Sequence, residues 1–126
     1  MGKKPQLRDE KRYSAKLLFQ FRVMCNGSPG KRRLCEERII TFASSNAKSA
    51  LREAKKRGHL AQHRYKNSDG NWVNFELVGI LELICLELIC DADEVWFEIK
   101  DRIEPMERCH RIVPDESRLH AIRNND

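Results

Sequence analysis

The chain has 126 residues, of which 40% are hydrophobic and 34% charged, and its 24 Lys and Arg against 19 Asp and Glu give a net charge of +5. This length suits one domain with a buried core, and the hydrophobic fraction is too high for wholesale disorder. No apolar run approaches the ~20 residues that a membrane-spanning helix needs. Residues 1–12 are almost wholly polar and give no signal-peptide pattern, so we expect a cytoplasmic protein without membrane contacts.

The cysteine content points to the same compartment. Five thiols cannot all pair within one chain, and an odd number fits a reducing environment better than a disulfide scaffold. We expect them to serve as small buried hydrophobes: Cys25, Cys35, Cys85, Cys90 and Cys109.

The first two expected strands form a hairpin after a basic, flexible arm at residues 1–12. Apolar side chains occupy every second position from Tyr13 to Val23, which predicts a half-buried strand. A turn-forming stretch follows at 26–30, and residues 34–43 are rich in β-branched and aromatic side chains.

The next segment, residues 46–57, is expected to be an amphipathic helix. Its apolar stripe is mostly alanine, Ser44 or Ser45 can cap its start, and Gly58 can end it. The opposite face is basic and carries Lys48, Arg52, Lys55, Lys56 and Arg57.

Three more strands are expected after the helix. Tyr65 and Lys66 lead into the hairpin turn Asn67-Ser68-Asp69-Gly70, and residues 72–84 resume as a strand in which Gly79 indicates a bulge or a close backbone approach. Alternation at Val95, Phe97 and Ile99 predicts the last strand. The periodicity fades after Pro105.

These elements predict a two-layer α+β domain. Its antiparallel sheet has about five strands in the order strand-strand-helix-strand-strand-strand, with one main amphipathic helix. We assign the domain to residues 13–104 and a C-terminal extension, with at most a short helix, to residues 105–126.

A tandem repeat, LELIC, occupies residues 81–85 and again 86–90. Because its period of five is odd, a continuous strand would turn the two copies to opposite faces. A bulge, a strand covered on both faces or a second subunit would each resolve this conflict. We favour a long strand whose distal part pairs in a homodimer through the region Leu81–Cys90, since an exposed apolar edge invites aggregation.

An ordered set of short motifs is similar to a known family. They are SAKLLF at 14–19, EERII at 36–40, ALREAKKRG at 50–58, YKNSDG at 65–70, FELVGILEL at 75–83 and EVWF at 94–97. Together they resemble a bacterial family catalogued as a domain of unknown function, four-two-eight-eight, over roughly residues 13–100. The resemblance implies a bacterial α+β domain and assigns no chemistry. The helix is more basic than is usual for that family, and the second LELIC copy looks like an insertion.

The charge is distributed unevenly. Residues 1–66 hold 18 basic and 5 acidic side chains, whereas residues 67–126 hold 6 basic and 14 acidic ones. If the halves form different faces, the basic face can attract nucleic acid; if they interleave in one sheet, the asymmetry cancels locally. A phosphate-binding stripe would combine the helix cations with Lys31, Arg32, Arg33, Arg64 and Lys66. A stacking platform for bases is missing, because Trp72 and Trp96 fit the core pattern.

The sharpest enzymatic pattern is Glu98-Ile99-Lys100. A carboxylate and a lysine two residues apart on a strand, with Asp69 or Glu76 from the neighbouring strand, would resemble the Mg²⁺ site of restriction-type nucleases. Asp69 is, however, fully explained by its turn. Cys85, Cys90, Cys109 and His110 lack the usual zinc spacings, so we expect no metal and no cofactor.

We therefore expect a non-catalytic protein-binding module. By analogy with small bacterial α+β proteins, it would be an immunity-type protein that occludes a toxin. Its expected interface is the basic helix face together with an acidic rim at Asp91, Asp93 and Glu94. Nucleic-acid binding by the basic helix face is the first alternative, and a Mg²⁺-dependent nuclease is the second.

Overall fold

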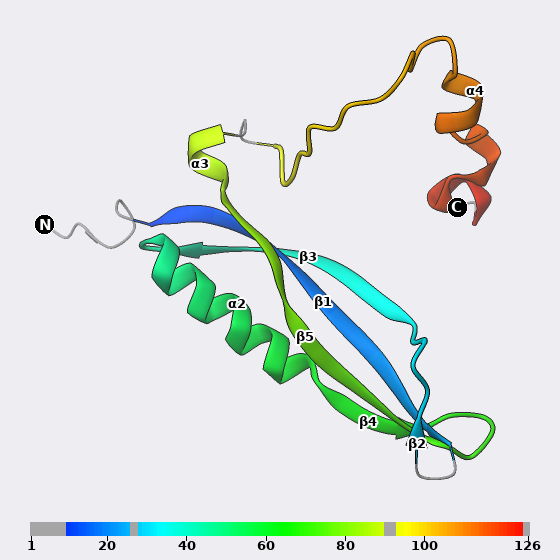
Figure 1. Ribbon diagram of the computed structural model, residues 1–126. Coiled ribbons are helices and arrows are strands. Elements are labelled where there is room, and N and C mark those ends of the chain that lie inside the picture. Colours follow the sequence, from blue (N-terminus) through cyan, green and yellow to red (C-terminus); the bar gives the residue numbers. More distant parts are fainter. Residues whose placement is uncertain (1–9, 26–27, 90–92, 125–126) are drawn as a thin grey trace, which may run out of the picture.

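The computed structural model describes residues 10–25, 28–89 and 93–124. One long antiparallel sheet is built around β1 (Lys11–Cys25), which pairs with β3 (Cys35–Ser44) on one side and β5 (Trp72–Cys85) on the other (Figure 1). The short β4 (His63–Lys66) extends the sheet beyond β5, and the two-residue β2 (Ser28–Pro29) pairs with the end of β1. The expected α+β fold with an antiparallel sheet is confirmed.

Strand β1 supplies the centre of the core, as its alternation predicts. Tyr13, Ala15, Leu17 and Phe19 are all buried and belong to one hydrophobic cluster, against which Phe21 packs. The strand begins at Lys11, so the last two residues of the predicted arm belong to the sheet. Residues 1–9 lie outside the described part of the chain.

Helix α2 (Ala47–Ala61) lies against one face of the sheet and is longer than predicted at its C-terminal end. Its cap is Asn46, whose side-chain oxygen accepts a hydrogen bond from the Ser49 backbone N–H at 2.9 Å. The expectation of Ser44 or Ser45 is therefore wrong, because Ser44 is still paired in β3. Ala50, Ala54 and Gly58 form the buried stripe.

Gly58 sets the distance between helix and sheet instead of ending the helix. A Cβ built on Gly58 would lie 2.8 Å from a Leu77 methyl carbon and 3.2 Å from one of Leu17, closer than side chains pack. The missing side chain therefore permits the close approach of α2 to β1 and β5. Gly58 keeps a helical backbone and does not adopt the left-handed conformation of a C-terminal cap, so the helix continues to Ala61.

Strand β5 contains the irregularity that Gly79 predicts. Its register with β1 shifts on both sides of the Leu17–Leu18 pair, which leaves Val78 and Leu81 as extra residues. A Cβ on Gly79 would meet nothing within 4 Å. Of the two explanations predicted for this glycine, the bulge is therefore confirmed and the close backbone approach is wrong. The predicted hairpin turn is also confirmed: Gly70 has φ of 81°, and Asn67 Oδ1 accepts from the backbone N–H groups of Asp69 and Asn71.

The LELIC repeat is divided between two kinds of structure. The first copy ends β5 at Cys85, and the second begins the short helix α3 (Leu86–Ile89). Leu86 is 0% exposed, whereas Leu81, at the same position of the first copy, is 48% exposed. The long continuous strand that we expected is therefore wrong, because the change from strand to helix absorbs the odd period. Cys90 lies outside the described residues.

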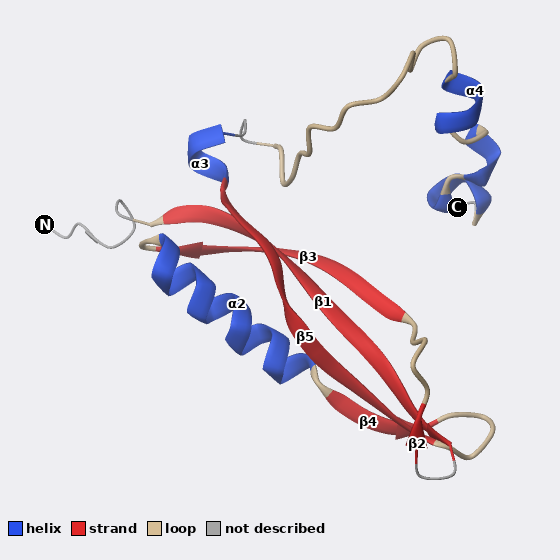
Figure 2. Ribbon diagram, in the orientation of Figure 1, coloured by secondary structure: helices blue, strands red, loops and turns tan. Residues whose placement is uncertain are grey.

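The last predicted strand is not formed. Residues 94–100, all of which the structure describes, adopt neither helix nor strand, and Val95, Phe97 and Ile99 are exposed. Alternation fits an extended chain, but a strand also needs a partner edge, and this segment pairs with none in the described structure. Figure 2 shows it as a loop leading to α4 (Cys109–Ile112), the 3₁₀ turn η1 (Glu116–Arg118) and α5 (His120–Arg123).

Candidate functional site

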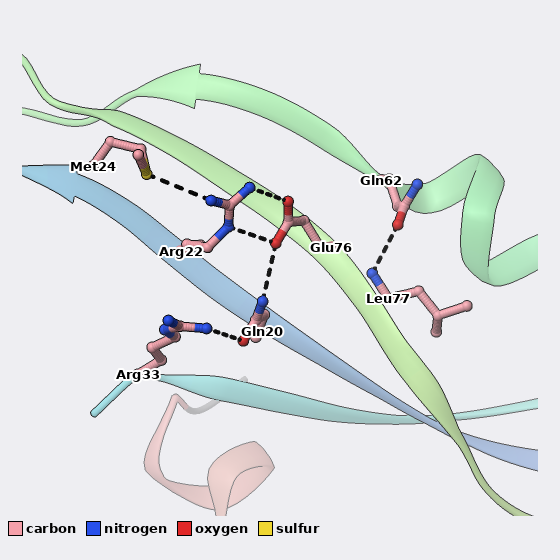
Figure 3. A network of polar contacts seen from close by, with 7 residues as sticks. All are labelled: Gln20, Arg22, Met24, Arg33, Gln62, Glu76 and Leu77. Atoms are coloured by element: carbon pink, nitrogen blue, oxygen red, sulfur yellow. Dashed lines mark hydrogen bonds and ion pairs between the residues drawn. The ribbon is translucent and has the colours of Figure 1, made fainter. Parts of the chain in front are cut away.

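The sheet face that points away from α2, here called the open face, carries a polar network near the end of β1. Arg22 forms a two-pronged contact with Glu76, with Nε–Oε1 at 2.9 Å and Nη2–Oε2 at 2.7 Å. Gln20 donates to Glu76 Oε1 and accepts from Arg33. Figure 3 shows these side chains reaching across β1 and β5. Such paired, charge-assisted contacts hold the surrounding side chains in fixed positions.

The Arg22–Glu76 pair should contribute to stability in a pH-dependent way. The hydrogen bonds from Arg22 lower the pKa of Glu76 from 4.5 to about 2. Because the folded-state pKa lies below the ordinary value, the stabilisation is complete above pH 4.5 and is lost as the pH falls towards 2. Solvent screening at a side chain that is 30% exposed reduces the contribution to about 1–2 kcal/mol.

We therefore expect Glu76→Gln to lower the free energy of unfolding by about 1–2 kcal/mol at neutral pH and by progressively less below pH 4.5. Urea unfolding of both proteins across this pH range measures the difference. Glu53→Gln is the control, because the exposed Arg57–Glu53 pair within α2 is worth only about 0.3–0.5 kcal/mol. A difference that stays constant down to pH 2 would contradict the assignment to this ion pair.

A second cluster lies on the open face around Lys16. Its Nζ is 2.9 Å from Glu98 Oε2 and 3.4 Å from Glu37 Oε1, and it lies 5.8 Å from the ring centre of Trp96. Hydrogen bonds from Lys16, Lys100 and Trp96 lower the pKa of Glu98 to about 2. These contacts attach residues 96–98 to the sheet and enclose a groove of about 490 Å³ that is also lined by Leu81 and Ile84.

The residues of the nuclease pattern are not assembled. Glu98 contacts Lys16, whereas Asp69 lies in the turn before Trp72, which pairs with Met24 at the far end of β1. Met24 lies eight residues beyond Lys16 along the strand, a distance of roughly 26 Å. Glu76, the other expected partner, pairs with Gln20, roughly 13 Å from Lys16 along the strand. The arrangement that the nuclease alternative requires is therefore not found among these residues, because Glu98 and Lys100 stand on a loop and pair with each other.

The predicted basic residues fall on two different surfaces. Lys48, Arg52, Lys55 and Lys56 are exposed on the outer side of α2, and in the described part of the chain the three lysines have no acidic partner. Arg57 instead turns to the flank, where it pairs with Glu53 and lies 5.0 Å from the ring of Phe42. Arg64 is on the open face beside Trp72. It is therefore on the opposite side of the sheet from the cations of α2, and the expected continuous basic stripe is not formed.

Ion pairs join the basic and acidic halves of the sequence. Strand β1 from the basic half of the sequence pairs with β5 from the acidic half. Ion pairs between the two halves are Arg22–Glu76, Lys16–Glu98 and Arg12–Glu87. These ion pairs neutralise part of the asymmetry within the fold. In the acidic rim, Asp93 and Glu94 are exposed after α3, and Asp91 lies outside the described residues.

The thiols and imidazoles that were considered as metal ligands are not gathered in the part of the chain that the structure describes. Within residues 10–25, 28–89 and 93–124, no group of three or more His, Cys, Asp and Glu side chains is placed to hold a metal ion. Cys85 ends β5, whereas Cys109 and His110 are exposed in α4. None of the helices over those residues has both the length and the apolar character to span a membrane.

Two features of the surface were missed from the sequence. Trp72 is 41% exposed on the open face, although its place in an alternating strand suggested a core residue. The C-terminal segment, residues 93–124, also exposes a series of large apolar side chains. In the sequence, the apolar residues of this segment are scattered without helical spacing. This irregular spacing is the one indication that they cannot form a single buried face.

Comparisons with known proteins agree with the resemblance found in the motifs. No curated protein and no solved structure matches the chain. A family model described as Domain of unknown function (DUF4288) matches residues 12–96, which include α2, α3 and all of the sheet except Lys11. The chain is therefore a member of the DUF4288 family.

Proposed function

We propose that this protein is a non-catalytic protein-binding module, of the immunity type that occludes a toxin, and that the C-terminal segment contacts the partner. The observation that supports this function is the exposure of apolar side chains along residues 93–124. They are 42–88% exposed. The set comprises Val95, Phe97, Ile99, Ile103, Met106, Val113, Leu119 and Ile122.

The segment has little internal support for its fold. Helices α4 and α5 have four residues each and contain no buried residue. Isolated helices of this length are unstable in water, because one turn does not offset the cost of nucleation. A partner surface that covers the apolar side chains would supply the missing stabilisation.

The contacts around Lys16 would hold the start of this segment in position for binding. Trp96 and Glu98 attach it to the sheet, and the loop that follows leads away to α4 (Figure 1). The lysines on α2 and the acidic residues Asp93 and Glu94 would form the charged rim of the interface. Their opposite signs also suit self-association, and a homodimer through the region Leu81–Cys90 stays a prediction.

The test uses the full-length chain and the polypeptide encoded by the adjacent gene, titrated by calorimetry. We expect binding with a negative heat-capacity change, because apolar surface is buried. The double variant Ile103→Ser, Met106→Ser should weaken binding by about tenfold or more. Arg111→Ser, Arg118→Ser is the matched control in the same segment and should leave the affinity within about threefold. Absence of binding, or equal affinity of the apolar double variant, would refute the proposal.

A second candidate function is nucleic-acid binding. The observation that favours it is the set of exposed cations without acidic partners on α2 and on β4. Such cations are free to neutralise phosphates, and the resulting affinity would fall steeply with salt. These cations lie on two surfaces, the outer side of α2 and the open face at β4. The two surfaces differ in the side chains around the cations, so each would suit a different kind of nucleic acid.

A further inference from the structure

We infer that the distal end of the open face, around Trp72, binds single-stranded nucleic acid. This inference rests on the second candidate function and names both its surface and its ligand. Trp72 lies opposite Lys66 of β4 and Met24 of β1. Trp72 is 41% exposed, and the Arg64 guanidinium carbon and Lys66 Nζ lie 4.2 Å and 5.3 Å from the centre of its ring.

The charges on this part of the open face suit a polyanion. Four cations, Arg22, Arg33, Arg64 and Lys66, lie on this part of the sheet, where Glu76 is paired with Arg22 and Asp69 lies in the turn between Lys66 and Trp72. Among the described residues neither Arg64 nor Lys66 forms an ion pair, and both lie over the tryptophan ring. The two cations are therefore available to phosphates without the loss of an existing salt bridge.

The side chains beside Trp72 offer polar groups to a base. Asn74 stands between Arg22 and Arg64 across the sheet, and its side-chain amide makes no hydrogen bond within the described structure. It lines an open groove of about 600 Å³ together with Gln20, Arg64 and Glu76, next to the part of the sheet that carries Trp72.

These features favour a single strand over a duplex. Aromatic side chains bind nucleic acid by stacking on bases, and bases inside a duplex are already stacked on each other. The outer face of α2 has cations but no exposed aromatic ring among them, so it could neutralise phosphates without this selection. The open face combines a ring, two cations and a free amide within one short stretch of β4 and β5.

The test is a titration of the full-length chain with oligothymidylate of about 12 nucleotides at low salt. The chain has two tryptophans, so Trp96→Phe leaves Trp72 as the only indole reporter. We expect its fluorescence to be quenched on binding. Arg64→Gln, Lys66→Gln should weaken binding about tenfold and reduce the slope of log K against log salt by about 1.4, or ~0.7 for each phosphate contact.

The matched control removes the same charge from the opposite side of the sheet. Lys55→Gln, Lys56→Gln should change the affinity by less than about threefold. If only this helix variant loses binding, our inference is wrong and the second candidate function stands. If a duplex of the same length binds but oligothymidylate does not, our inference is wrong and the second candidate function stands; if neither binds, both are wrong. Equally tight binding of a duplex of the same length, or of polyglutamate, would also overturn the assignment to a single strand.

Discussion

Phe19→Ala should lower the free energy of unfolding by about 3–5 kcal/mol, a large part of the ~5–15 kcal/mol that holds a typical domain folded. Phe19 is 0% exposed, and its ring stacks on Phe75 with centroids 4.6 Å apart and planes 14° from parallel. On the same face, the Arg38 guanidinium carbon lies 4.8 Å from the Phe19 ring centre. Truncation removes the buried ring and leaves a cavity that strands on both sides cannot fill.

Urea unfolding followed by circular dichroism measures this loss as a lower midpoint with an unchanged slope. Phe97→Ala is the control with the same chemistry, because Phe97 is 42% exposed in the C-terminal segment. We expect it to change stability by less than about 1 kcal/mol. A loss below about 1 kcal/mol for Phe19→Ala would show that β1 is not the centre of the core.

The second large effect is expected within the LELIC repeat, where the two copies allow the same substitution to be compared at equivalent positions. Leu86→Ala should cost about 2–4 kcal/mol, because Leu86 is 0% exposed and anchors α3 against β1. Leu81→Ala, the same substitution at the equivalent position of the first copy, should cost less than about 1 kcal/mol, since Leu81 is 48% exposed.

Differential scanning calorimetry of the two variants would measure this contrast directly. For a chain of this size, a change of about 3 kcal/mol lowers the unfolding temperature by roughly 10 °C. Equal effects at the two positions would mean that both copies occupy equivalent environments, as they would in a continuous strand covered on both faces. That result would contradict the observed change from strand to helix at Leu86.

The candidate surfaces were only partly predictable. The exposure of the lysines on α2 is predictable from helical spacing. The alanines recur every three to four residues and mark the buried side of the helix, so the lysines between them must lie on the outer side. The exposure of Trp72 does not follow from spacing, because alternation tells which residues share a face of a strand but not which face is covered. Helix α2 covers the face of Phe75 and leaves the face of Trp72 open.

The sequence by itself determined the local elements of this protein: the alternating strand β1, the alanine stripe of α2 and the turn at Asn67–Gly70. Each is encoded within a few neighbouring residues by spacing or by turn chemistry. Only the tertiary structure decided that Gly58 brings the helix onto the sheet, that the second LELIC copy becomes helical and that residues 95–99 stay unpaired. Those outcomes depend on whether a distant segment supplies a backbone partner or a packing surface, and no local pattern records where such a segment lies.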